Sequence, residues 1–330
     1  MKAELYIKKN NESVFLPIIE DSITLQQEMR GAPSKLTFTV IKDQLLSDEG
    51  GFNEGVPVAL YIDGKGVFLG YVFTKSRDKA HHIECVAYDQ LRYLKNKATY
   101  VYTNKTASEV VKMIAEDFKL VTGTIEDTGF KISQRIREDE TMFDVIQDAL
   151  DLTFDHTRKD YVLFDDFGKI TLKNIENMQL NTLIDDETAQ NFDYSTSIDD
   201  DTYNYILLVE EVKTKDGQTK RVPYTAKDDS NIDKWGRLVY FQTISETTNA
   251  QALANSLLKL KNRKTRKLTL KGCFGDINVR AGSSIHIVLN LGDVKAHELR
   301  SRFVCESVTH TFQNGMHLMD LTIADTGVGK

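Results

Sequence analysis

Cysteine, proline and tryptophan are scarce in this chain of 330 residues, which contains three, four and one of them. The cysteines, Cys85, Cys273 and Cys305, lie far apart and form no CxxC pair, so we expect no structural disulfide. No stretch approaches the roughly 20 uninterrupted apolar residues of a membrane-spanning helix. The first residues contain no apolar segment of signal-peptide length. We therefore expect no membrane insertion and synthesis that ends in a cytoplasm.

A basic excess is also missing. The chain has 42 Lys and Arg residues against 49 Asp and Glu residues, which gives a net charge of −7. This balance argues against a dedicated duplex-DNA-binding protein, whose surface needs a basic excess. By segment, the net charge is 0 for residues 1–98, −6 for 99–182 and −1 for 183–330. With 41% hydrophobic residues, a chain of this length can bury two or three separate cores.

Residues 1–98 show the alternation that is typical of strands. Leu36, Phe38 and Val40 alternate with threonines, and residues 58–62 and 67–73 flank the turn sequence Asp63-Gly64-Lys65-Gly66. Another strand is expected over residues 82–88. We predict that this first domain is a small antiparallel β-barrel.

Residues 99–182 change to a helical period. Thr106-Ala-Ser-Glu109 has the spacing of a capping box, and a second amphipathic helix is expected to begin at Thr141. Residues 161–172 then predict a hairpin around Asp165-Asp-Phe-Gly168. We predict an inserted α+β domain made of helix, helix and hairpin.

Residues 183–330 return to strands and form the third predicted domain. We expect a long strand over residues 203–213, a turn at 215–218, a polar excursion over about 214–247 and one helix over 249–262. Asn249 or Thr248 can cap this helix. The basic stretch 259–267 lies at its C-terminal end, where cations complement the helix dipole. We prefer that role to contact with nucleic acid or with an acidic partner. Asn314-Gly315 predicts a final hairpin.

The two ends of the chain share a spacing that suggests an internal repeat. In both ends, a strand with Leu-Thr comes before a glycine, and a further strand begins three residues after that glycine. Chance can also align strands of period two. If the repeat is real, the chain contains two similar barrels with the α+β domain between them. The matched pairs are Leu36 and Leu268, Gly55 and Gly282, Val58 and Ile285, Phe68 and Phe303, Thr74 and Thr309, His82 and His317, and Val86 and Leu321.

No recognisable catalytic motif is present, since the chain has no GxSxG elbow, Walker loop or GxGxxG after a strand. His310 and His317 can approach each other across the final hairpin, but a third metal ligand is missing. Four acidic runs fall at predicted turns, where aspartate binds nearby backbone amides. Cys85 and Cys305 lie within alternating strands and are expected in the core. We assign no catalytic, cofactor-binding or metal-binding residue. The acidic runs are Asp165-Asp166, Asp185-Asp186-Glu187, Asp199-Asp200-Asp201 and Asp228-Asp229.

Several stretches together resemble the XkdQ/YqbQ family of baseplate hub proteins from contractile-tailed phages, PBSX-like prophages and phage-tail-like bacteriocins (tailocins). The resemblance covers essentially the whole chain. The stretches are residues 87–95 (AYDQLRYLK), 104–108 (NKTAS), 143–150 (FDVIQDAL), 161–172 (YVLFDDFGKITL), 280–282 (RAG) and 308–312 (VTHTF).

The resemblance implies a mainly β chain in which two tail-tube-like antiparallel β-barrels flank the inserted domain. It also implies a structural protein that is not an enzyme. Three copies would form a ring of pseudo-six-fold symmetry, which joins the six-fold tail tube to the three-fold central spike. The implied partners are a homotrimer of the chain itself, the spike, the tube protein, and other baseplate and LysM-type hub-associated proteins. No specific nucleic acid is implied. The implied location is a virion or tailocin baseplate assembled in the bacterial host cytoplasm.

Two other functions remain open from the sequence. A tail-associated cell-wall hydrolase, either glycosidase or peptidase, would use a pair of acidic residues such as Asp165 and Asp166. A soluble protein that binds a peptide or glycan through its barrels would be a monomer with a ligand cleft.

Overall fold

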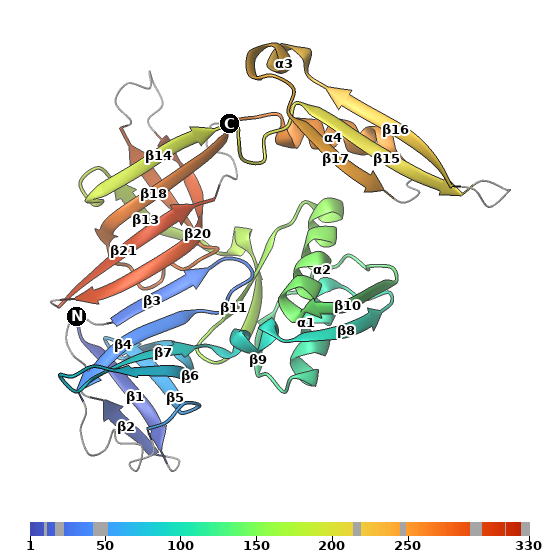
Figure 1. Cartoon of the computed structure of the whole chain (residues 1–330). Coiled ribbons are helices and arrows are strands. Elements are labelled where there is room, and N and C mark those ends of the chain that lie inside the picture. Colours follow the sequence, from blue (N-terminus) through green and yellow to red (C-terminus); the bar gives the residue numbers. More distant parts are fainter. Residues whose placement is uncertain are drawn as a thin grey trace. The chain divides into compact units, whose positions relative to one another are not determined.

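The computed structural model describes residues 1–9, 12–16, 23–41, 52–213, 219–244, 249–290, 299–313 and 315–324. The chain divides into two compact units (Figure 1). Unit 1 comprises residues 1–192 and 269–330, and unit 2 comprises residues 193–268. The division falls within strands β14 (Asn191–Ser197) and β18 (Thr265–Phe274). Three features named above lie outside the described residues: the turn at 215–218, Thr248 and Asn314.

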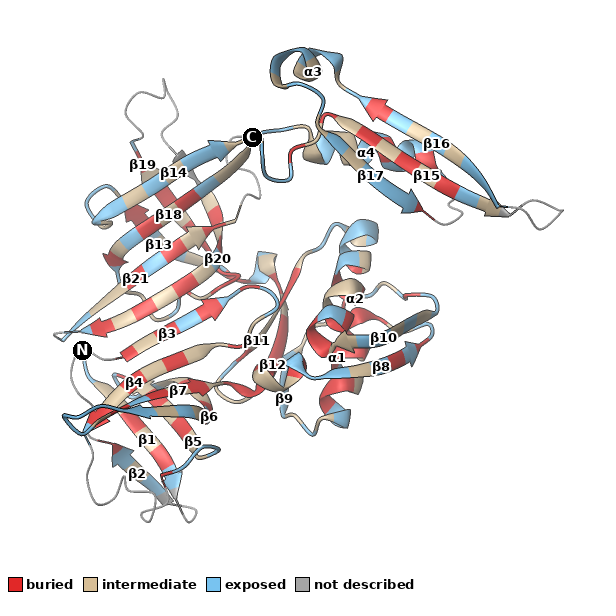
Figure 2. Ribbon diagram, viewed as in Figure 1, coloured by how far each residue is buried: buried red, intermediate tan, exposed pale blue. Residues whose placement is uncertain are grey.

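A mainly antiparallel sheet of 13 strands forms the centre of unit 1. Its strands alternate between buried and exposed residues, as Figure 2 shows for β3 and β4. The strand order is β14-β18-β21-β20-β3-β4-β7-β6-β5-β1-β2, and β13 and β19 join it through β20. Besides β14 and β18, the strands are β1 (Ala3–Lys9), β2 (Glu12–Leu16), β3 (Ile23–Glu28), β4 (Lys35–Ile41), β5 (Pro57–Ile62), β6 (Lys65–Arg77), β7 (His82–Tyr88), β13 (Gln179–Asp185), β19 (Ser284–Leu289), β20 (Leu299–Gln313) and β21 (Met316–Ile323).

The prediction of a mainly β chain is confirmed, but the prediction of two closed barrels is wrong for the part of the chain that the structure describes. The path of the sheet there runs from β14 to β2 and does not return on itself. The reason lies in β20, which is 15 residues long. Its first part pairs with β19, and its second part pairs with β3. The second half of the sheet therefore continues into the first half instead of closing.

The predicted repeat reappears as a repeated strand order. The first half runs β3-β4-β7-β6-β5-β1, and the second half runs β14-β18-β21-β20-β19-β13. Six of the seven matched residue pairs lie on corresponding strands, from β4 with β18 to β7 with β21. The matched glycines share an unusual backbone conformation, because φ is +86° at Gly55 and +88° at Gly282. That left-handed region favours glycine, so both halves need this residue at the same bend.

The inserted part of unit 1 contains two helices and two small sheets. α1 (Ala107–Asp117) begins with the predicted capping box, in which Thr106 and Glu109 bond to each other's backbone N–H. α2 (Met142–Thr157) begins after Thr141, as predicted. The two helices share one apolar core. The other elements are η2 (Gln90–Lys95), β8 (Lys97–Tyr102), β9 (Thr122–Ile125), β10 (Arg135–Thr141), β11 (Tyr161–Asp165), β12 (Ile170–Asn174) and η3 (Ile175–Asn177).

Unit 2 has a core of its own. Its sheet has the order β16-β15-β17 and carries α4 on one face. Asn249 caps α4, as predicted. The stretch expected as a polar excursion contributes a strand, a helix and a second strand to this unit. The elements are β15 (Tyr205–Lys213), β16 (Thr219–Lys227), α3 (Asp229–Trp235), β17 (Val239–Ile244) and α4 (Ala250–Lys261).

Among the residues that the structure describes, no helix is long and apolar enough to cross a membrane.

Candidate functional site

The junction between the two sheet halves is the first candidate for an assembly site. We call it the seam: residues 307–312 of β20 pair antiparallel with all of β3, from Ser307 opposite Glu28 to Phe312 opposite Ile23 (Figure 1). Leu25 is buried at its centre, opposite the buried His310. The seam forms a full strand pairing between segments that are almost 300 residues apart. It therefore joins the two halves of unit 1 through main-chain hydrogen bonds.

The histidines predicted to approach each other do meet beside the seam. Nδ1 of His310 and Nε2 of His317 are 2.8 Å apart, and Nε2 of His310 is 2.9 Å from the carbonyl oxygen of Val279. The ring of His317 also stacks on Phe312. Burial lowers the pKa of His310 to about 3 and that of His317 to about 4. Both rings are therefore neutral near pH 7, and the pair is a buried hydrogen-bonded element of the second half.

The acidic runs mostly serve turns and caps. Asp185 accepts hydrogen bonds from Glu187 N, Thr188 N and Thr188 Oγ1. Asp228 is the N-cap of α3, and Asp201 forms an ion pair with Lys261. In the described part of the chain, no group of three or more His, Cys, Asp and Glu side chains could hold a metal ion.

Asp165 has a different role, because it belongs to a buried cluster of charged groups. It accepts hydrogen bonds from Gln90 Nε2 at 2.9 Å and from Gly168 N at 2.6 Å. Arg280 Nη2 donates to the main-chain oxygen of Asp165 at 3.0 Å, and its guanidinium lies 3.7 Å from the ring centroid of Phe164. This cluster ties the turn between β11 and β12 to the end of β7 and to the loop before β19.

Asp89 completes the charged cluster from the end of β7. Its carboxylate accepts from Ser34 N at 2.9 Å and from Leu91 N at 3.0 Å. Burial raises the pKa of Asp89 to about 7, and the nearby Asp165 raises it further. Burial also raises the pKa of Asp165 and lowers that of Arg280 to about 10. A cavity beside Arg280 has a volume of only about 10 Å³, so the cluster has no room for a substrate and acts as a structural tie.

The turn between β11 and β12 inserts an aromatic side chain against the first sheet half. The ring of Phe167 contacts Tyr61 at 5.3 Å between centroids. It also lies over Gly66, where an added Cβ would be 2.6 Å from the Phe167 ring. A glycine at position 66 therefore allows the inserted domain to approach β6 closely.

We expect Gly66→Ala to lower the free energy of unfolding by about 1–3 kcal/mol, because the new methyl group overpacks the Phe167 ring. The measurement is urea unfolding in a double-mutant cycle with Phe167→Ala. The penalty for alanine at position 66 should largely disappear once the ring is absent. An unchanged penalty in the Phe167→Ala background would contradict this contact.

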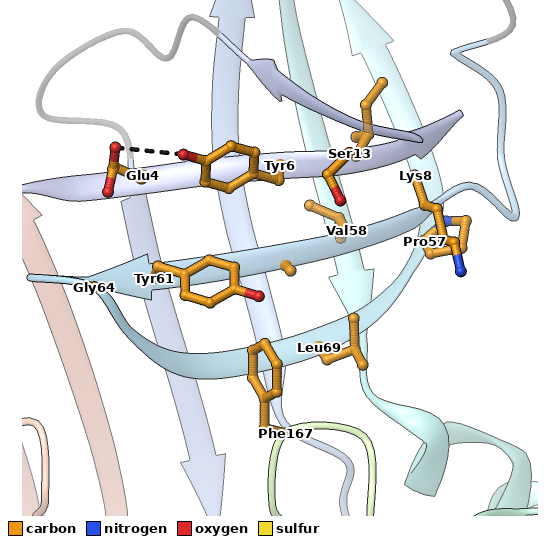
Figure 3. A pocket seen from close by; sticks show the side chains of 12 residues that line it. Glu4, Tyr6, Lys8, Ser13, Pro57, Val58, Tyr61, Gly64, Leu69 and Phe167 are labelled. Atoms are coloured by element: carbon orange, nitrogen blue, oxygen red, sulfur yellow. Dashed lines mark hydrogen bonds between the residues drawn. The ribbon is translucent and has the colours of Figure 1, made fainter. Parts of the chain in front are cut away.

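The second candidate site is an open groove on the face of β1, β5 and β6 that points away from the core (Figure 3). We call it the aromatic groove. Its volume is about 450 Å³. Tyr6, Tyr61 and Phe167 line it, and Glu4 and Lys8 lie toward opposite ends (Figure 3). The other lining residues are Ile7, Ser13, Pro57, Val58, Ala59, Gly64 and Leu69.

The remaining sequence candidates have structural roles. Cys85, Cys273 and Cys305 are free and buried, and burial raises the pKa of each thiol to about 12. In the basic stretch, Lys259 and Lys261 lie in the last turn of α4, as predicted. Lys261 also lies over the rings of Tyr203 and Tyr240.

Sequence reasoning missed both the charged cluster and the aromatic groove. Asp89 and Arg280 are 191 positions apart, and neither belongs to a motif. One signal for the groove was present in the sequence: Phe167 is an aromatic residue in the polar turn Asp165-Asp-Phe-Gly168. Exposed turns are usually polar, so an aromatic residue there suggests a docking contact.

Comparison with known proteins gives consistent matches along the chain. Residues 23–324 match the family model described as YQBQ-like. The uncharacterized protein YqbQ of Bacillus subtilis (strain 168) is 30% identical and covers 98% of this chain and 96% of its own length. The phage-like element PBSX protein XkdQ of the same organism is 29% identical, with coverages of 98% and 97%.

A solved structure shares the fold at low sequence identity. It is the 43 kDa tail protein of prophage MuSo2 from Shewanella oneidensis, with a TM-score of 0.70 and 10% identity. The match covers 97% of this chain and 98% of that protein. The succession of sheet and inserted domain is thus preserved where side chains have almost entirely changed.

Proposed function

The chain belongs to the YqbQ-like family, and from that premise we propose that it is a structural hub of a phage-tail or tailocin baseplate. Three copies form a ring that joins the tail tube to the central spike. Its other partners are further baseplate proteins, including LysM-type proteins. It assembles in the host cytoplasm and acts in the finished particle. Its functional parts are the sheet-forming segments 1–98 and 183–330 and the inserted segment 99–182.

The seam is the observation that carries this proposal. Each chain contains two halves with the same strand order, joined where β20 pairs with β3. Three chains supply six such halves, and a closed ring needs equivalent junctions between chains. In the second half, β14 holds the position that β3 holds in the first, and it is the last strand of the described sheet. We propose that β14 of one chain pairs with the first half of the next, as β3 pairs with β20.

Light scattering on the purified chain tests the ring. It is measured alone and with the spike protein encoded beside it, over a range of concentrations. A mass of about three times 37.5 kDa in either condition is expected. A strict monomer in both conditions, even at the highest concentration, would contradict the proposal.

A proline variant directs the same measurement to β14. Ser195 is exposed on this strand, and proline removes the N–H that an arriving strand requires. We expect Ser195→Pro to weaken trimer formation, while Thr243→Pro on the edge strand β17 leaves it unchanged. Circular dichroism of both variants checks that they remain folded. Equal trimer formation in both folded variants would count against β14 as the contact.

A cell-wall turbidity assay separates the hub from a hydrolase. The purified chain is expected to leave cell walls intact. Clearance that disappears in an Asp165→Asn, Asp166→Asn variant would support a hydrolase instead.

A further inference from the structure

The aromatic groove has a regular arrangement of rings that the hub proposal does not use. Phe15, Tyr6, Tyr61 and Phe167 follow one another with centroid separations of 5.7, 5.6 and 5.3 Å. The interplanar angles are 71°, 90° and 68°, so each ring stands nearly perpendicular to the next. Slots therefore lie between successive rings. Phe15 is 51% exposed, which extends the row of rings beyond the groove.

The lining of the groove restricts the chemistry of its ligand. Its centre, around Ala59 and Leu69, is apolar, and the polar side chains lie toward its ends (Figure 3). The Tyr6 hydroxyl donates to Glu4 at 3.4 Å, and Glu4 also pairs with Lys2. A sugar bound across the centre would leave several hydroxyl groups without partners, which is costly. A proline-rich segment has few polar groups to satisfy and is extended before it binds.

From this geometry we infer that the aromatic groove binds a proline-rich, extended segment of another protein. Polyproline II segments dock in aromatic-lined grooves, where the rings form pockets for successive side chains. Glu4 at one end of the groove favours a basic residue at the corresponding end of the segment, and Lys8 at the other end favours an acidic group. The ligand comes from another protein, because the four prolines of this chain, at positions 17, 33, 57 and 223, are all isolated.

The groove has no counterpart in the second half of the chain. By the spacing of the repeat, His286 and Val288 occupy the positions of Ala59 and Tyr61. In addition, β13 pairs with β19 in parallel, whereas β1 pairs with β5 antiparallel. Each chain therefore carries one groove. The inference does not require the ring, since all the lining residues come from a single chain.

Fluorescence polarisation with the full chain tests this inference. The probe is a labelled peptide of one arginine followed by nine prolines, and the control peptide has glycine and serine in place of the prolines. We expect saturable binding of the proline peptide only. Tyr61→Ala and Tyr6→Ala should each weaken it about tenfold, which is the size of effect expected from losing an aromatic contact. Phe241→Ala, which removes an aromatic residue that is 60% exposed on β17, should leave binding unchanged.

Two further measurements identify the ligand class. Glu4→Gln should weaken binding of the arginine-containing peptide severalfold and make it less sensitive to salt. Chitohexaose is the saccharide probe. The inference is overturned if no proline peptide binds at millimolar concentration, if binding is equal in Tyr61→Ala, or if chitohexaose binds in a Tyr61-dependent manner while the peptide does not. Because binding is measured on the chain in any oligomeric state, failure here is distinct from failure of the ring.

Discussion

Arg280→Met is expected to lower the free energy of unfolding by about 3 kcal/mol at pH 8. The guanidinium of Arg280 holds the turn at Asp165 through its hydrogen bond to the main chain and lies against Phe164. It is also the cation of a cluster that contains the buried carboxyl groups of Asp89 and Asp165. Removing one member of a buried charged group leaves the other charges without compensation, and this loss is much larger than that of a surface ion pair.

The loss should depend on pH in a defined direction. Burial raises the pKa of Asp89 to about 7 and also raises that of Asp165. The folded chain therefore binds more protons than the unfolded chain above pH 3.8, and its stability falls as pH rises through the raised pKa values. Because Arg280 lowers the pKa of Asp165, its removal raises that pKa and steepens the fall. We expect the variant to be closer to wild type at pH 5 than at pH 8.

Urea unfolding at pH 5 and pH 8 measures this effect, and Arg302→Met is the matched control. Arg302 also donates to a main-chain oxygen, that of Leu180, at 2.8 Å. Its loss should cost about 1 kcal/mol, with the same value at both pH values. If Arg280→Met and Arg302→Met behave alike, the charged cluster does not hold the three parts of unit 1 together.

The second large effect is expected from the histidine pair. In wild type, the pKa of His317 is lowered from 6.5 to about 4 by burial, so the unfolded chain takes up a proton first as pH falls. Stability from this group is complete above pH 6.5 and is lost as pH falls toward 4. The expected loss is about 2 kcal/mol, reduced from the full linkage value because His317 is partly exposed to solvent.

His317→Gln removes this titration and keeps an N–H that can donate to His310. We expect the stability difference between variant and wild type to shift by about 2 kcal/mol in favour of the variant between pH 7 and pH 4. The comparison uses differences because Asp89 contributes in the opposite direction over the same pH range. His156→Gln, at an exposed position on α2, is the control. If both variants follow the wild-type pH profile, protonation of His317 does not destabilise the fold.

Local sequence signals were sufficient for most of the separate elements. The capping residues Thr106, Thr141 and Asn249 each begin the helix that was predicted for them. The turn sequence at 63–66 joins β5 to β6. These signals are reliable because a cap or a tight turn is decided by hydrogen bonds among residues that are close in sequence.

Pairings between distant segments could not be predicted in this way. The alternation of β20 indicates a strand but does not say that its second part will pair with β3 rather than close a barrel. The polar stretch after residue 213 showed little apolar periodicity, and it joins β15 and α4 to form unit 2. In both cases the partner that buries the strand lies elsewhere in the chain, so the local pattern does not contain the answer.

The sequence by itself determined the mainly β character, the two capped helices of the insert, the repeated spacing of the two halves and the family to which the chain belongs. These properties follow from periodicity, caps, turns and matched stretches, which are all readable in order along the chain. Only the tertiary structure decided that the sheet stays open, that Asp89, Asp165 and Arg280 share one buried cluster, and that Phe167 completes the aromatic groove. The reason is physical: burial, charge compensation and ring contacts depend on which distant residues meet in space, and an amphipathic strand can satisfy its apolar face with more than one partner.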